Sequence, residues 1–208
     1  ADDLENARRA ASLALQQDPL YVDGNTTLGL LVLAEGDTHQ ALEALQRVVE
    51  QRPQNGRAWL GIGLAQFVGG EMDEAAASLQ KAANQLHNHL GTLNALAWVY
   101  ILKKDAIQAE TTLLRALEMD RTFAETHGTL AIVALMKGNL DSAVQAVKRA
   151  NGLDRENFAG NFANSLIQQV SGNPTQARAI MEKLLTSPVL PGEITLQEAI
   201  AKALAKKL

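Results

Sequence analysis

The sequence contains no cysteine, and only 4% of its 208 residues are aromatic. Without cysteine the chain has neither disulfides nor thiolate metal ligands, and its redox compartment stays undetermined. Few aromatic residues beside abundant alanine and leucine disfavour sheets and favour closely packed helices. No apolar run reaches about 18 residues, so we predict no segment that spans a membrane.

Basic residues are also few, since 19 lysines and arginines stand against 23 acidic residues and leave a formal charge of −4. Proteins that bind nucleic acid usually carry a basic stripe, and because none is visible we predict no nucleic-acid partner. An apolar fraction of 47% is ample for a packed core. The chain starts at Ala1 without a signal-like segment, so we expect a processed product or a piece of a longer protein.

Motifs that carry catalytic chemistry are missing too: the sequence has no G-x-S-x-G, no phosphate-binding loop and no H-E-x-x-H. The histidines are His39, His87, His89 and His127. His87 and His89 are spaced like a pair of metal ligands, but a zinc site needs three or four ligands and no third lies nearby in the sequence. We therefore predict a solvated turn there, and no catalytic residue, cofactor or metal.

A period of 34 residues organises what is present. It is clearest in one row of alanines, Ala41, Ala75, Ala109, Ala143 and Ala177, and in a row of small residues, Gly29, Gly63, Ala97, Ala131 and Ser165. Turn signals share the period, as at Gly36-Asp37 and Gly138-Asn139, with Lys104-Asp105 as an exception. Coincident rows at one step indicate a chain built from repeats.

Each repeat is predicted to fold as a helix, a short turn and a second helix. Apolar residues at spacings of three and four on both sides of the turn indicate two amphipathic helices. A glycine just past the first helix suits a left-handed C-cap, and Asp37 or Asn139 is a typical start of the second. Small residues at Gly63 and Ala75 predict that the two helices of a repeat approach each other closely.

These features resemble the tetratricopeptide repeat. The resemblance consists of the 34-residue step, the start Trp59-x-x-Ile62-Gly63, the central alanine, and the run from Ala116 to Asp120. It implies an all-α fold, a right-handed α-α superhelical solenoid of helix pairs. It predicts one domain over 1–208, with an orphan second helix in 1–21, full repeats at 22–55, 56–89, 90–123, 124–157 and 158–191, and a C-terminal helix in 192–208. That last helix is amphipathic and basic; it is interpreted as a cap on the last repeat, with a membrane- or partner-binding tail as the alternative.

In this family the first helix of each repeat lines a concave groove, and the groove positions here are unusually apolar. The predicted partner-binding residues are Leu30, Leu33, Leu60, Leu64, Phe67, Trp98, Ile101, Ile132, Leu135, Phe162 and Leu166. Other positions of the first helices already supply a core stripe, so this second apolar stripe predicts a groove that takes an apolar ligand. Deeper burial or self-association is the alternative.

The predicted function is a non-enzymatic protein-binding module, a scaffold or chaperone-like protein that holds an apolar or amphipathic segment of a partner. The alternatives are a structural module of a bacterial envelope, pilus or secretion assembly, and a regulatory domain of an enzyme. At the N-terminus, Leu4, Ala7, Ala11, Ala14 and Leu15 give the first helix an apolar face without its usual covering helix. We therefore expect a weak homodimer through this end.

Overall fold

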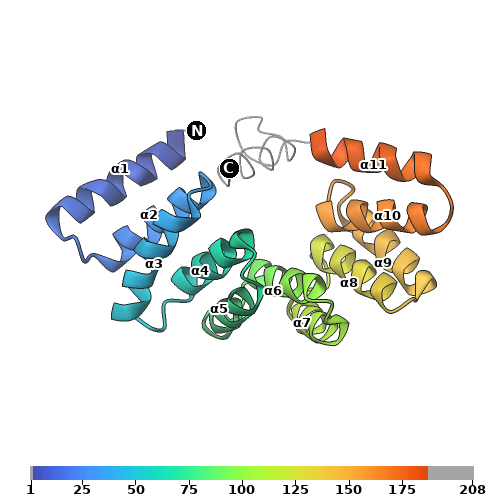
Figure 1. The fold of residues 1–208 in the computed structure, drawn as a ribbon, viewed down its shortest axis with the longest axis horizontal. Coiled ribbons are helices and arrows are strands. Elements are labelled where there is room, and N and C mark those ends of the chain that lie inside the picture. Colours follow the sequence, from blue (N-terminus) through green and yellow to red (C-terminus); the bar gives the residue numbers. More distant parts are fainter. Residues whose placement is uncertain (1, 187–208) are drawn as a thin grey trace. The chain divides into compact units, whose positions relative to one another are not determined.

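The computed structural model describes residues 2–186, so the predicted C-terminal helix at 192–208 lies outside the described residues. All regular structure in the described part is α-helical (Figure 1). The helices are α1 (Asp2–Gln17), α2 (Val22–Ala34), α3 (Thr38–Gln51), α4 (Gly56–Gly69), α5 (Met72–Gln85), α6 (Leu90–Leu102), α7 (Ala106–Met119), α8 (Ala124–Met136), α9 (Leu140–Leu153), α10 (Phe158–Val170) and α11 (Pro174–Thr186). The prediction of an all-α solenoid of helix pairs is confirmed.

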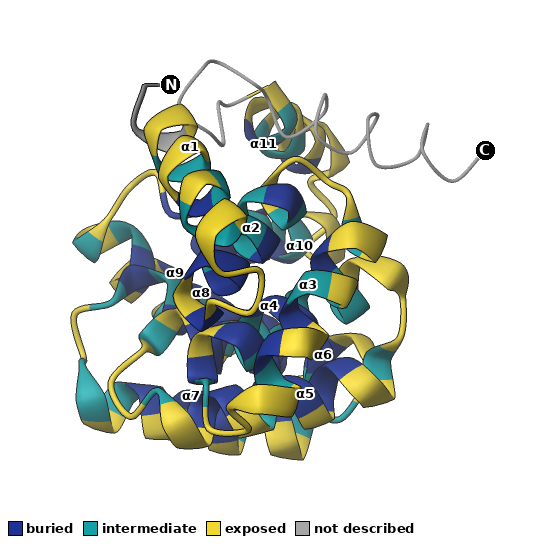
Figure 2. Cartoon of the chain, turned by 90° about the vertical axis from the view of Figure 1, so that its left-hand side faces the viewer, coloured by how far each residue is buried: buried dark blue, intermediate teal, exposed yellow. Residues whose placement is uncertain are grey.

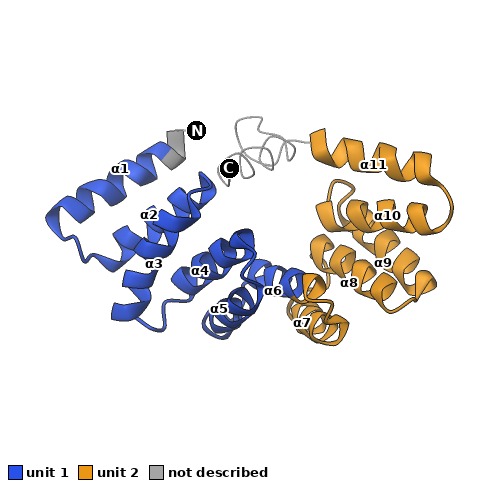
Figure 3. Ribbon diagram, viewed as in Figure 1, with its two compact units in different colours: residues 1–99 blue, residues 100–208 orange. Residues whose placement is uncertain are grey.

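The chain divides into two compact units, which we call unit 1 (Ala1–Val99) and unit 2 (Tyr100–Leu208) (Figure 3). The border falls inside α6. In unit 1, α2 packs on α3 and α4 on α5, while α2 also contacts α4. In unit 2, α8 packs on α9, and α10 contacts α8, α9 and α11. The single continuous domain and its repeat borders stay a prediction.

The turn inside each helix pair has the predicted chemistry. Four glycines after the first helices have positive φ angles between 73° and 85°, at Gly36, Gly70, Gly138 and Gly172. These are the left-handed C-caps that glycine adopts without steric cost. Asp37, Asp105 and Asn139 then cap the following helices, each accepting a hydrogen bond from the backbone N–H three residues on, at 3.0–3.1 Å. Lys104 takes the place of the glycine in the third turn and still has a φ of 60°.

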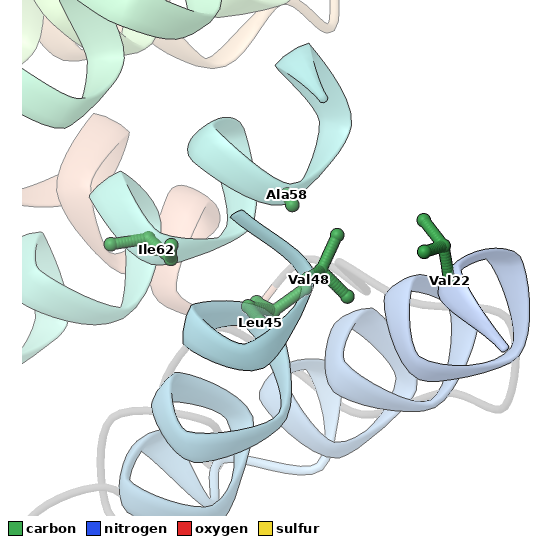
Figure 4. Packing of buried hydrophobic residues seen from close by; sticks show 5 residues of the cluster. All are labelled: Val22, Leu45, Val48, Ala58 and Ile62. Carbon is green, nitrogen blue, oxygen red and sulfur yellow. The ribbon is translucent and has the colours of Figure 1, made fainter. Parts of the chain in front are cut away.

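The core of unit 1 lies between the first helices and the second helices of its helix pairs. Val22, Leu45, Val48, Ala58 and Ile62, which come from α2, α3 and α4, form one buried cluster (Figure 4). Burial of such aliphatic side chains is the main favourable term in folding. Buried and exposed residues accordingly lie on different sides of the individual helices (Figure 2).

Glycines set the distance between helices. In unit 1, a Cβ added at Gly63 of α4 would lie 2.6 Å from Cγ of Leu79 in α5. In unit 2, a Cβ at Gly128 of α8 would lie 2.2 Å from the backbone N of Gly160 in α10. The predicted close approach within a helix pair is therefore present at Gly63, and Gly128 allows a still closer approach between two first helices.

The N-terminal helix differs in detail from the prediction. Ala11 is buried, because α2 packs against α1 and covers part of its apolar face. The exposed apolar side chains at this end are instead Leu13, Leu20 and Tyr21. The side chain of Leu4 is outside the described part of the chain. Self-association through this end stays a prediction, and Leu13 rather than Ala11 is the residue that would serve it.

Candidate protein-binding surface

The first helices of the pairs are almost free of charge. Asp23, Arg57 and Glu125 are the charged residues of α2, α4, α6, α8 and α10 taken together. By contrast, each of the second helices α3, α5, α7, α9 and α11 carries three. Charged residues are therefore concentrated on the second helices, whereas the first helices are apolar over most of their length.

The predicted partner-binding residues of unit 1 are all half-buried. They are Leu30 and Leu33 of α2, Leu60, Leu64 and Phe67 of α4, and Trp98 of α6. Leu30 reaches the neighbouring first helix, because a Cβ added at Gly61 of α4 would lie 2.8 Å from its Cδ2. We call these six residues the apolar face of unit 1. Each of them is partly covered by neighbouring residues and partly accessible to solvent.

In unit 2 the predicted residues divide into two groups. Ile101 and Ile132 are buried, at 9% and 4% exposure, and so contribute packing and no open surface. Leu135 of α8 and both Phe162 and Leu166 of α10 are half-buried, and α8 contacts α10. These three half-buried residues are the apolar face of unit 2.

Sequence reasoning missed a more exposed apolar row. It consists of the thirteenth residue of each predicted repeat, Ala34, Val68, Leu102, Met136 and Val170, and all five are exposed. The large members range from 37% exposure at Met136 to 67% at Val170. This row lies one helical turn beyond the ninth residues of the repeats, and therefore on the same side of each first helix. Those ninth residues are Leu30, Leu64, Trp98, Ile132 and Leu166. The 34-residue spacing of Val68, Leu102, Met136 and Val170 was the signal that could have revealed it.

An aromatic pair was missed as well. Phe158 and Phe162, one turn apart on α10, stack with ring centroids 5.9 Å apart and ring planes 6° from parallel. Phe158 is 38% exposed. Stacked aromatic rings offer a large apolar area with little conformational freedom to lose, which suits them to binding. Phe158 therefore extends the apolar face of unit 2.

The start of α10 is held by a carboxylate from α8 and by the N-cap residue just before α10. The Glu125 carboxylate of α8 accepts hydrogen bonds from the backbone N–H groups of Phe158 at 2.6 Å and Ala159 at 2.9 Å. The side chain of Asn157 accepts another from the N–H of Gly160 at 2.7 Å. These bonds satisfy N–H groups that the first turn of a helix leaves without partners. One of the three charges on the first helices is thus used to position α10.

Gln66 of α4 holds the one buried side-chain oxygen in the described residues that lacks a hydrogen-bond partner. A buried hydrogen-bond acceptor without a donor lowers the free energy of unfolding by about 1–3 kcal/mol. We expect Gln66→Met, which keeps the length of the side chain and removes the orphan oxygen, to raise the free energy of unfolding by about 1 kcal/mol. Urea denaturation followed by circular dichroism measures this change.

Gln168 of α10 is the matched control, because its side chain donates to Asn164 at 3.4 Å and accepts from Asn173 at 3.0 Å. Gln168→Met should leave stability unchanged or lower it. An equal loss of stability in both variants would show that Gln66 is satisfied in solution.

Within residues 2–186, no three His, Cys, Asp or Glu side chains are grouped so that they could hold a metal ion. His89 instead caps α6, since its Nδ1 accepts a hydrogen bond from the N–H of Thr92 at 3.1 Å. Nδ1 of His87 lies 3.1 Å from the carbonyl oxygen of Gln85. Both rings are exposed. The described part contains no helix long and apolar enough to cross a membrane.

One carboxyl group has a shifted pKa, and it lies in a turn. The Asp120 carboxylate accepts hydrogen bonds from the hydroxyl and the backbone N–H of Thr122, and these lower its pKa. Because the folded-state pKa is depressed, the stabilisation is present at neutral pH and is lost as the pH falls through that pKa. The shift is caused by hydrogen bonds within this turn.

Comparison with known proteins agrees with this architecture. The tetratricopeptide repeat family matches the chain over residues 26–88 and again over residues 90–123. No curated protein matches it.

Several solved structures share the fold. A tetratricopeptide repeat protein from Parabacteroides merdae is 19% identical, with a TM-score of 0.72 over 99% of this chain and 81% of that one. The pilF protein of Pseudomonas aeruginosa is 18% identical, with a TM-score of 0.70 over 98% of this chain and 90% of that one. MamA is 23% identical, with a TM-score of 0.66 over 74% of this chain and 91% of that one.

At these identities the likeness concerns the fold and does not extend to partners. The match to the repeat family supports a more general statement about function. Tetratricopeptide repeats generally mediate interactions between proteins, and the fold is typically non-catalytic. The chain therefore carries the signature of the tetratricopeptide repeat over residues 26–88 and 90–123.

Proposed function

We propose that this protein binds an apolar or amphipathic segment of a partner protein on the faces of its first helices, as a scaffold or chaperone-like module. The observation that supports this is the separation of charge between first and second helices. A surface with so few charges can form few ion pairs with a ligand. Its binding energy must then come from apolar area removed from water.

The residues proposed to bind are the half-buried ones. Side chains such as Leu64, Phe67 and Trp98 are held by neighbouring helices and still present part of their area to solvent. Preorganised anchors of this kind lose little conformational entropy on binding, and aromatic ones often dominate the energy of an interface. The exposed thirteenth-position row, as at Val68, would add a rim to the same surface.

A neutral amphipathic helix with a leucine stripe is a suitable probe for unit 1. Trp98 lies on its apolar face, whereas Trp59 is occupied elsewhere: its Nε1 donates to the Pro53 carbonyl at 2.7 Å, and Lys81 Nζ lies 3.9 Å from its ring centroid. In a Trp59→Phe variant, the fluorescence of Trp98 therefore reports directly on the proposed surface. We expect binding to shift its emission to shorter wavelength as water is displaced from the ring.

Truncation of an anchor tests the assignment. Phe67→Ala or Trp98→Ala is expected to weaken binding of the peptide at least tenfold, because a lost aromatic anchor commonly costs roughly 2 kcal/mol. Isothermal titration calorimetry measures the affinity, and circular dichroism checks that helix content is retained. Leu13→Ala, which truncates an exposed side chain of α1, is the control and should bind as the wild type does.

Two results would contradict the proposal. If Phe67→Ala and Trp98→Ala bound the peptide as tightly as the wild type, unit 1 would have no binding face at these residues. If they lowered the melting temperature and left affinity unchanged, these side chains would be core residues.

A further inference from the structure

The outer face of α7 differs from that of every other second helix described. Ile107 is 75% exposed and Leu114 is 51% exposed. The equivalent residues of the other repeats are all polar: His39, Asp73, Asp141 and Thr175 for Ile107, and Gln46, Gln80, Lys148 and Glu182 for Leu114. The fold therefore does not require apolar residues here, and the third repeat alone presents them to water.

The turn just before α7 is the second departure of this repeat. Lys104 adopts a left-handed φ of 60°, where the other turns have glycine. A side chain with a Cβ pays a steric cost in this conformation that glycine avoids. Residues in this conformation persist when the surrounding structure holds them there. Lys104 is exposed and brings a positive charge close in sequence to Ile107, the first residue of the exposed apolar pair.

These residues belong to one line along the helix. Lys104, Ile107, Thr111, Leu114 and Glu118 follow one another at spacings of three and four, which places the helical members on one face of α7. We call these five residues the α7 seam. Ile107 and Leu114 lie on either side of the central Thr111, the beginning of the seam is basic and its end is acidic. Two seams that run in opposite directions are therefore complementary to each other.

We propose that the α7 seam pairs with the α7 seam of a second copy of this chain, antiparallel about a two-fold axis near Thr111. In this arrangement Ile107 of each copy packs against Leu114 of the other, and Lys104 of each lies near Glu118 of the other. A two-fold contact uses the same patch on both subunits, which requires the self-complementarity found here. A partner other than a second copy of the chain would not require the seam to be complementary to itself.

The contact is expected to be weak. One helix face per subunit buries less than the roughly 1,200 Å² of a standard stable interface, so the dimer should form reversibly at high micromolar concentration. Its charge pairs are exposed to solvent, and added salt should weaken the association further.

Charge reversal tests the antiparallel pairing. By sedimentation equilibrium at low salt, Lys104→Glu and Glu118→Lys should each weaken dimerisation about tenfold, since both symmetric charge pairs then repel. The double variant should recover wild-type affinity. The two positions are 14 residues apart, or roughly 21 Å along the helix, so they do not touch within one copy and recovery reports a contact between copies.

Replacing the apolar residues of the seam by glutamate distinguishes this contact from contacts through other surfaces. A variant with both Ile107→Glu and Leu114→Glu should be monomeric at every concentration reached, with unchanged circular dichroism because both side chains are exposed. Leu13→Glu, on α1, tests the competing prediction of self-association through the N-terminal helix; if the dimer forms through the α7 seam instead, this variant should leave it intact. A monomeric wild type, a dimer that survives in the α7 variant, or a dimer lost in Leu13→Glu would each overturn the proposal, and the last would assign the contact to α1.

Discussion

Replacing Gly128 by alanine is expected to destabilise unit 2 by about 3 kcal/mol or more. The new Cβ would lie 2.2 Å from the N of Gly160 and 2.6 Å from the carbonyl carbon of Ala159. Both are backbone atoms, which cannot move aside as a flexible side chain can. The added methyl group can be accommodated only if α8 and α10 separate.

Separation of these helices would have a second cost. Glu125, one turn before Gly128, is hydrogen-bonded to the first turn of α10. Moving the helices apart would stretch these bonds and expose Ala159 and Ala163, which are fully buried. The destabilisation therefore combines steric overlap, lost helix capping and lost apolar burial.

Urea denaturation followed by circular dichroism measures the effect, and Gly152→Ala is the matched control in the same unit. Gly152 lies in α9, and a Cβ there meets no atom within 4 Å. Because alanine is the better helix former, this control should gain up to about 1 kcal/mol. If the Gly128→Ala variant had the same urea midpoint of unfolding as the wild type, α8 and α10 would not approach each other closely in solution.

Leu45→Ala is expected to cost unit 1 about 3 kcal/mol, within the usual range for a buried leucine. Leu45 of α3 is fully buried, in the core cluster of unit 1. Its side chain lies against two glycines: a Cβ at Gly29 would be 2.6 Å from its Cγ, and one at Gly61 would be 2.6 Å from its Cδ1. The leucine fills the space that these glycines leave, so its truncation creates a cavity between three helices.

The pairing of Leu45 with Gly29 can be tested by a double-mutant cycle. Gly29→Ala alone should destabilise the protein by about 1–3 kcal/mol, because its methyl group overlaps the leucine. Added to Leu45→Ala, the same methyl group enters vacated space, so the double variant should be more stable than the sum of the single effects by at least about 1 kcal/mol.

Leu45→Ala combined with Gly152→Ala is the control cycle, since Gly152 lies in the other unit. Its effects should add within about 0.5 kcal/mol. Strict additivity for Leu45 and Gly29 would show that the two residues do not share a space.

The surface proposed to bind partners could be predicted only in part. Apolar residues at the ninth and twelfth positions of the repeats, with Leu60 and Phe162 at the fifth, make up the eleven predicted residues, and nine of the eleven are half-buried in the structure. The pattern could not distinguish Ile132, which is buried, from Leu166, which is not. The difference depends on how closely the neighbouring helices pack at each point, and the spacing of residues along one helix carries no information about that.

The sequence by itself determined the local structure: the 34-residue step, the helix pairs, the left-handed glycine turns at Gly36 or Gly138 and the capping at Asp37 or Asn139. These depend on contacts between residues a few positions apart, so their signals are short-range and repeat with the period. Tertiary structure alone decided that Glu125 caps another helix, that Gly128 meets a backbone, and that Gln66 has an orphan oxygen. Each of these depends on atoms brought together from separate helices, and identical local patterns in different repeats meet different neighbours.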